Sequence, residues 1–289
     1  MILQARGRSL TFPRRPLVMG IVNINDDSFC GDGTLDPEAA LRLAQQMAAE
    51  GADIIDAGAE SARTNRAAIS VDGEIQRFAS FISAWQAWCG GIDVKCPSWD
   101  AEQVWPPLLS LNTWRPEVVE AVLLLGGHLL NDIGALPDNR NAKHCARHGA
   151  ALLIMHSVGL PKEKHTHIGY PDIMAELDCF FAEKLVMCQE AGLALESIVL
   201  DPGIDFAKQR QDNLTIFREL GRMSRFGRPV LLPVSRKTVI GEVLDQPDPL
   251  DRDAGTLACI ARGLSTGAQI FRVHNVRAAA EAVKVLWAI

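Results

Sequence analysis

Residues 198–206 read Ile-Val-Leu-Asp-Pro-Gly-Ile-Asp-Phe, an apolar run that stops abruptly at an acid, a proline and a glycine. This pattern predicts a buried strand that ends near Asp201. If the strand belongs to a parallel sheet, the carboxylate of Asp201 lies at the carboxyl end of that sheet, where α/β folds bind their ligands. A carboxylate that caps the following turn gives the same pattern, and this segment alone does not separate the two interpretations.

Similar apolar runs recur along the chain, each followed by a loop and a helical pattern. Besides the run before Asp201, they cover residues 17–24, 53–58, 108–112, 128–132, 151–156, 229–232 and 269–274. The helical patterns cover about 36–51, 71–88, 116–126, 139–147, 171–190, a segment ending near 225, 252–265 and 278–287. Eight strands that alternate with eight helices predict the α/β class and a (β/α)8 TIM barrel.

The rest of the chain adds little to this barrel. Residues 1–15 indicate a short N-terminal hairpin or arm, and we expect one domain over residues 1–289. A doubly wound sheet is the alternative, but no G-x-G-x-x-G follows any of the strands. Residues 90–107 are rich in tryptophan and proline and too long for an ordinary loop. We expect them on the face away from the ligand site, packed over a helix end rather than against a partner.

Composition excludes several classes of protein. Hydrophobic residues make up 48% of the chain and charged residues 22%, which is ordinary for a globular protein with a large core. The net charge of −6 gives no reason to expect nucleic acid or an anionic membrane as a partner. No apolar run approaches the ~20 residues of a membrane span, and the N-terminus lacks a signal-peptide core. Seven scattered cysteines without C-x-x-C spacing favour reduced thiols in the cytoplasm.

Polar side chains stand at the end of nearly every predicted strand. They are Asn23, Asp56, Asn112, Asn131, Asp132, His156, Asp201, Arg272 and His274, with Arg63 and residues 235–237 in the loops. The carboxyl ends of barrel strands meet at one mouth, so a ligand site explains this pattern better than separate caps and turns do.

The residue types suggest two kinds of ligand. The first group could read a flat nitrogen-rich heterocycle such as a pterin or guanine, and it consists of Asn112, Asn131, Asp201 and Lys237. The second, suited to a small anion such as phosphate or pyrophosphate and to Mg²⁺, is Asn23, Arg63, Arg272 and His274.

Several motifs resemble those of the dihydropteroate synthase family. Residues 19–29 (MGIVNINDDSF) and 51–63 (GADIIDAGAESAR) are similar to its first two signatures. Residues 130–133, 155–156, 200–206, 235–237 and 272–274 follow in the family's order and spacing. The resemblance covers about residues 16–288, except for 90–107.

The resemblance implies a TIM barrel that joins 6-hydroxymethyl-7,8-dihydropterin pyrophosphate to p-aminobenzoate and releases pyrophosphate. Pyrophosphate would leave first, and the amine would then attack a pterin cation. The implied pterin-binding residues are Asn112, Asn131, Met155, Asp201 and Lys237. The implied pyrophosphate-binding residues are Asn23, Arg63, Arg272 and His274, with Mg²⁺ at Asn23. Phe206 and Thr238 would border p-aminobenzoate, the catalytic residues would be Arg63, Lys237 and Asp201, and a homodimer is expected.

This chain departs from the family pattern at several loop positions. Asn112 and Asn275 stand where Asp is usual, and Asp205 where glycine is usual. Other departures are Ala62 and Thr64 in the second loop, Asn25 and Asp26 in a shortened first loop, and Pro233-Val234 before Ser235. Loss of the charge at Asn112 alone would cost ~10²-fold in rate.

Two alternatives therefore remain beside an active synthase. A paralogue could keep the pterin pocket but lack the condensation or use another acceptor. A pterin-dependent methyltransferase domain would share the barrel, but it would not need Arg63, Arg272 and His274 to bind an anion.

Overall fold

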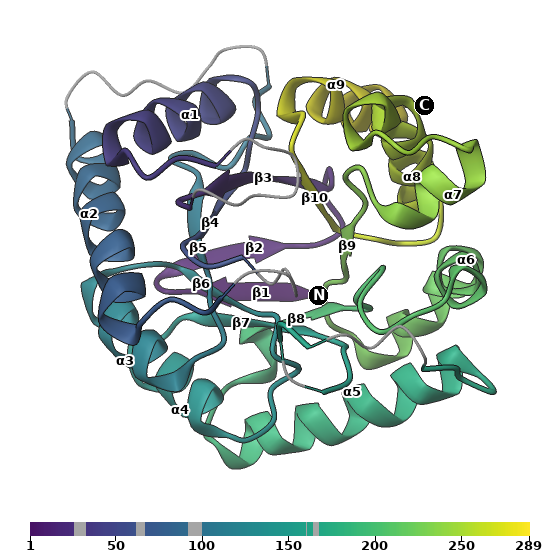
Figure 1. Ribbon diagram of the computed structural model, residues 1–289, viewed down its shortest axis with the longest axis horizontal. Helices are drawn as coiled ribbons and strands as arrows, with labels where there is room; N and C mark the ends of the chain where they lie inside the picture. Colours follow the sequence, from purple (N-terminus) through teal and green to yellow (C-terminus); the bar gives the residue numbers. More distant parts are fainter. Residues whose placement is uncertain (26–32, 62–66, 92–99, 160, 164–167) are drawn as a thin grey trace.

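A closed parallel barrel forms the centre of the molecule (Figure 1). The computed structural model describes residues 1–25, 33–61, 67–91, 100–159, 161–163 and 168–289. In these residues the barrel strands are β3 (Leu17–Asn23), β4 (Ile54–Gly58), β5 (Leu108–Asn112), β6 (Leu129–Asp132), β7 (Ala151–Met155), β8 (Ile198–Asp201), β9 (Leu231–Pro233) and β10 (Ile270–Val273). Neighbouring strands pair in parallel, and a bridge between Leu200 and Val230 closes the ring. The predicted TIM barrel is confirmed, and its closure excludes a doubly wound sheet.

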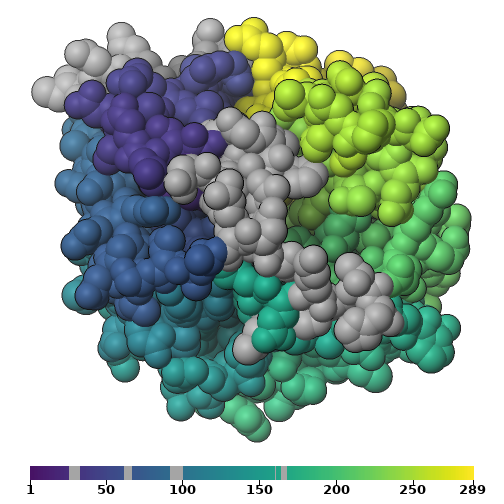
Figure 2. Space-filling model, in the orientation of Figure 1, coloured from purple at the N-terminus to yellow at the C-terminus, as the bar shows by residue number. Residues whose placement is uncertain are grey.

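Helices cover the outside of the barrel in chain order, which Figure 2 shows as a colour sequence around the molecule. The α-helices in the described part are α1 (Pro37–Ala49), α2 (Val71–Cys89), α3 (Pro116–Leu125), α4 (Arg140–His148), α5 (Ile173–Glu190), α6 (Arg210–Glu219), α7 (Thr238–Leu244), α8 (Asp253–Ser265) and α9 (Val276–Ala288). Three short 3-10 segments accompany them: η1 (Leu195–Ser197), η2 (Leu220–Phe226) and η3 (Pro249–Arg252).

Local sequence explains most helix starts, but helix α7 was not predicted. The backbone N–H of Glu38 donates to the carboxylate of Asp36 at 3.0 Å, as the sequence predicts for the start of α1. Helix α7 has only seven residues and no side-chain cap of its own at Lys237, so it gives no signal in the sequence.

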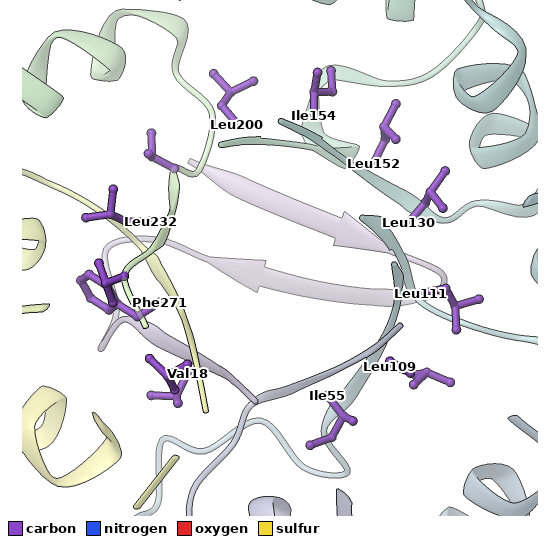
Figure 3. Packing of buried hydrophobic residues seen from close by; sticks show 14 of the residues in the cluster. Val18, Ile55, Leu109, Leu111, Leu130, Leu152, Ile154, Leu200, Leu232 and Phe271 are labelled. Atoms are coloured by element: carbon purple, nitrogen blue, oxygen red, sulfur yellow. The ribbon is translucent and has the colours of Figure 1, made fainter. Parts of the chain in front are cut away.

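Strand side chains alternate between two apolar cores. Outward-facing residues such as Val18, Leu130 and Phe271 point from the barrel wall toward the helices (Figure 3). Inward-facing residues such as Met19, Leu153 and Val199 fill the barrel together with the hairpin residues Leu3 and Leu10. This period of two decides which strand-end side chains reach a ligand.

The amino-terminal end of the barrel is closed by the predicted hairpin, β1 (Ile2–Ala5) and β2 (Arg8–Thr11). Arg15 forms buried ion pairs with Asp53 at 2.9 Å and with Asp100 at 3.0 Å. Gln103 donates to the carbonyl of Ala48 at 2.8 Å, so the described part of the 90–107 stretch packs over the end of helix α1, as expected. Residues 92–99 lie outside the described part.

Candidate active site

A cavity of about 310 Å³ opens at the carboxyl ends of the strands. The residues that line it within the strands and directly after them lie two positions apart, because only those side chains share the inner face of the barrel. They include Ile21 and Asn23, Asn131 and Ile133, Pro233 and Ser235, and Arg272 and His274.

The structure brings the described candidate residues to this one cavity. Its lining includes Asn23, Asn112, Asn131, Met155, Asp201, Phe206, Lys237, Thr238, Arg272 and His274. Arg63 lies outside the described residues. The individual roles of all these residues remain predictions.

Two of the polar strand-end residues, Asp132 and His156, face away from the cavity, because side chains alternate along a strand and theirs point outward, toward the helices. Asp132 follows the inward-facing Asn131, and its carboxylate accepts hydrogen bonds from Gly134 and Asn141, both at 2.8 Å. Burial raises the pKa of Asp132 to about 6. His156 follows the inward-facing Met155 and packs against the rings of Tyr170 and Phe180. The prediction that the polar residues at the strand ends converge on one mouth was wrong for these two residues.

Asp56 organises the floor of the cavity, although no specific role was predicted for it from the sequence. Its fully buried carboxylate accepts hydrogen bonds from Ser110 at 2.6 Å and Asn131 at 3.0 Å, with a longer contact from Asn112 at 3.4 Å. Arg272 Nε lies 2.7 Å from Asp56 Oδ2. A single carboxylate therefore orients side chains from both ligand groups that the sequence predicts.

Asn112 leaves one polar atom without a partner. Its amide nitrogen donates to Asp56, whereas its Oδ1 is buried and accepts no hydrogen bond from the described residues. This oxygen is therefore an unsatisfied acceptor beside the cavity that Asn112 lines.

Asp201 is a buried acceptor on the same floor. Burial raises its pKa to about 6, and the Gly203 N–H at 2.7 Å together with the charge of Lys237 opposes that rise. The carboxylate is therefore ionised at neutral pH, at an energetic cost that a ligand with N–H donors would offset.

Lys237 connects the floor to an aromatic wall. Its ammonium donates to the carbonyl of Ile204 at 2.8 Å and lies 4.9 Å from the centre of the Phe206 ring. Burial lowers the pKa of Lys237, and the carboxylates of Asp205 and Asp201 oppose this effect.

Lys208 supports the same wall from behind, and the sequence reasoning missed it. Its ammonium donates to the carbonyls of Phe206 at 3.0 Å and His156 at 3.3 Å and lies 2.8 Å from His156 Nδ1. Burial lowers the pKa of Lys208 to about 7 and that of His156 to about 2. A neutral His156 can therefore accept from Lys208, and the contact joins the ends of strands β7 and β8.

Ser235 and His274 form a hydrogen-bonded pair where strands β9 and β10 end. Ser235 Oγ lies 2.7 Å from His274 Nδ1 and accepts from the backbone N–H of His274 at 3.0 Å. The hydroxyl proton is then available to Nδ1, which leaves the ring N–H on Nε2. Glu60, which also lines the cavity, is paired with Arg115 at 2.9 Å and with Lys162 at 3.2 Å.

Two departures from the family pattern stabilise helix starts in this structure. Asp205 has a φ of 68°, and its carboxylate accepts from the N–H of Thr238 at 2.5 Å. Asn275 caps helix α9 through Ala278 at 3.2 Å and donates to Asp253 at 3.0 Å.

The described residues fit Mg²⁺ only as an ion whose ligands come partly from the protein and partly from the substrate and water. They contain no cluster of three or more His, Cys, Asp or Glu side chains that could bind a metal alone. Asn23 offers a hard amide oxygen at the cavity, and Mg²⁺ commonly takes its other ligands from substrate phosphates and water.

The closed barrel, with buried acceptors such as Asp201 at a mouth cavity, is the architecture expected of a pterin-binding TIM barrel. Comparison with known proteins agrees, because the family model described as "Pterin binding enzyme" matches residues 19–274. The dihydropteroate synthase of Escherichia coli (strain K12) is 35% identical over 287 residues, 99% of this chain and 95% of that protein. The chain belongs to the dihydropteroate synthase family.

Solved structures support the same assignment. The Yersinia pestis dihydropteroate synthase in a sulfonamide drug complex matches with a TM-score of 0.87 at 33% identity. The match covers 100% of this chain and 98% of the Yersinia pestis chain. The Thermus thermophilus dihydropteroate synthase in complex with 4-aminobenzoate has a TM-score of 0.82 at 33% identity and covers 100% of both chains.

Proposed function

We propose that this protein condenses 6-hydroxymethyl-7,8-dihydropterin pyrophosphate with p-aminobenzoate and releases pyrophosphate, a step of folate biosynthesis. The observation that carries the proposal is a single cavity whose lining combines heterocycle acceptors, anion donors and an aromatic wall. Membership of the dihydropteroate synthase family supports this reading.

The pterin ring would lie on the floor of the cavity. Asp201 and the unpartnered Oδ1 of Asn112 would accept from its N–H groups, and Asn131 and Lys237 would donate to its oxygen and nitrogen atoms. Met155 would pack against the ring. These residues come from strands β5 to β8 and from the start of helix α7.

The pyrophosphate would lie on the side of strands β3 and β10. Arg272 and the Nε2–H of His274 would donate to its oxygens, with Arg63 as a third donor. Asn23 would hold Mg²⁺ together with those oxygens. When bound, Mg²⁺ would neutralise charge on the leaving pyrophosphate.

The aromatic amine would lie beside Phe206 and Thr238, between the aromatic wall of the cavity and the sites of the pterin and the pyrophosphate. Support comes from the cation–π pair of Phe206 and Lys237, which orients the ring, and from the 4-aminobenzoate complex of the Thermus thermophilus relative.

The chain's own residues then act by binding and by electrostatics. The bond between the pterin methylene carbon and the pyrophosphate oxygen breaks, and both electrons leave with pyrophosphate. Arg272 and His274 stabilise the departing charge, and the Asp201 carboxylate stabilises the electron-poor pterin. The amine nitrogen then attacks the methylene carbon and loses a proton. No side chain has to act as a nucleophile.

We also propose a cytoplasmic homodimer. The described part has no helix long and apolar enough to cross a membrane, and its five cysteines are free thiols. Exposed apolar side chains on helix α7 and segment η3 (Val243, Leu244 and Leu250) offer a contact surface. Light scattering would test it, and Leu250→Asp should shift a dimer toward monomer.

A coupled assay of pyrophosphate release tests the reaction. Purified protein with Mg²⁺ and the pterin pyrophosphate should release pyrophosphate faster when p-aminobenzoate is added. Asp172→Asn, a helix-cap variant outside the cavity, is the control for handling and folding. Release that does not respond to the amine would contradict the condensation.

A further inference from the structure

Asp205 carries a negative charge into the part of the cavity that the proposed function gives to the amine. Its side chain lines the same cavity as Phe206 and Thr238. We propose that Asp205 is a specificity-determining residue that disfavours carboxylated aromatic amines relative to uncharged ones. This inference rests on the proposed function, because it assumes that the amine lies beside Phe206 and Thr238.

The contacts of Asp205 fix its carboxylate in this position. Its oxygens accept from the backbone N–H groups of Thr238 at 2.5 Å and Val239 at 3.3 Å and from Asn213 Nδ2 at 3.2 Å. The backbone N–H of Asp205 in turn donates to Asn213 Oδ1 at 2.9 Å. The side chain is therefore held by bonds on both oxygens and does not swing freely into solvent.

Capping alone does not require the charge. An asparagine oxygen accepts from backbone N–H groups as well as a carboxylate oxygen does at helix starts. The negative charge of Asp205 is therefore an additional property of this wall, and its effect on a ligand is separable from its effect on helix α7.

The local balance of charge is unfavourable for a further anion. Lys237 contacts this wall from the cavity and Lys208 from behind, and the carboxylates of Asp205 and Asp201 act on both ammonium groups. Burial lowers the pKa of Lys208 to about 7, so this second ammonium is only partly charged at neutral pH. Arg272, the permanently charged cation on the opposite side of the described lining, lies 2.7 Å from Asp56. An amine that carries a carboxylate adds a third negative charge around Lys237, whereas an uncharged amine adds none.

The amide groups of Thr238 and Val239 are also already occupied. A carboxylate placed beside Thr238 would have to displace Asp205 from them or remain without those donors. The repulsion weakens binding of p-aminobenzoate, which remains a substrate, and does not act on an uncharged analogue such as 4-aminobenzamide, whereas the occupied donors are lost to both amines.

Calorimetry with these two amines tests the inference independently of turnover. Each amine is titrated into protein that holds 6-hydroxymethylpterin and pyrophosphate, which occupy the other parts of the cavity without reacting. Asp205→Asn removes the charge and keeps a capping oxygen, and Asp205→Gly removes both while tolerating the positive φ. Asp172→Asn is the matched control, because Asp172 also caps two consecutive amides, those of Met174 and Ala175, outside the cavity.

Asp205→Asn should tighten binding of 4-aminobenzoate about tenfold, the effect expected from one like charge a few ångströms away, and change 4-aminobenzamide less than about twofold. Asp172→Asn should change neither. An unchanged ratio of the two dissociation constants in Asp205→Asn would overturn the inference, and so would amine binding that is absent from every variant. A shifted ratio in a protein that forms no product would support the inference and refute the proposed reaction.

Discussion

Arg272 Nε and Asp56 Oδ2 lie 2.7 Å apart, and this ion pair connects the two halves of the cavity floor. Asp56 is fully buried on strand β4, and Arg272 reaches it from strand β10. The same carboxylate accepts from Asn131, so the position of the pyrophosphate donor depends on a group that also orients the pterin side.

Asp56→Asn should therefore weaken the contacts to both the pterin part and the pyrophosphate part of the substrate. The substitution leaves Arg272 without its countercharge. If the new amide nitrogen faces Asn131, two donors also face each other. kcat/KM should therefore fall by about 10–100-fold. Steady-state kinetics would measure the change. Asp132→Asn is the control, because Asp132 is equally buried but faces the helices. It should leave KM unchanged, and an equal loss of activity in both variants would refute a special role for Asp56.

Asp201→Asn should stabilise the protein at neutral pH. The folded-state pKa of about 6 lies above the ordinary value of 3.8, so the folded state binds the proton more tightly than the unfolded state. Stability from this group is present below pH ~4 and lost as pH rises through ~6. The variant should gain on the order of 1–3 kcal/mol over the wild type at pH 7.5 and little at pH 4.

Urea unfolding at the two pH values would measure this gain. The same variant should bind the pterin pyrophosphate at least about tenfold more weakly, because the ionised acceptor is gone. A variant less stable than the wild type at pH 7.5, or one with undiminished pterin affinity, would disagree with the assigned position of Asp201.

Asn112→Asp should raise turnover. The added carboxylate would lie beside the proposed pterin cation and stabilise it, with an expected gain of about tenfold or more in kcat. The new charge would also face Asp56, since the two side chains are 3.4 Å apart, so stability should fall. An unchanged or lower kcat would mean that the loop departures, and not the charge at Asn112, set the rate.

Lys208→Met should loosen the wall that Phe206 forms. Without the ammonium, the carbonyls of Phe206 and His156 lose their shared donor, so KM for p-aminobenzoate should rise about threefold to tenfold. Lys184→Met is the control, because Lys184 is also largely buried and contacts Glu183 on helix α5, outside the cavity. Similar kinetic effects in the two variants would indicate a general loss of stability.

The sequence predicted the barrel because each strand is an apolar run that ends in a polar residue at a turn. The same pattern did not show side-chain parity, which separates the inward-facing Met155 from the outward-facing His156. Helix α7 was missed because its capping carboxylate, Asp205, lies in a different loop. The role of Lys208 could not be predicted, because its partners, two backbone carbonyls and the His156 ring, are brought together only by folding.

The cavity at the barrel mouth is proposed to join a pterin to an aromatic amine. Mass spectrometry of a reaction with the pterin pyrophosphate, Mg²⁺ and p-aminobenzoate tests this most directly. We expect dihydropteroate in amounts that match the pyrophosphate released, and a loss of at least about tenfold in its rate of formation with Asp201→Asn. Measurable pterin binding without any dihydropteroate would contradict the proposed reaction and leave a pterin-binding paralogue.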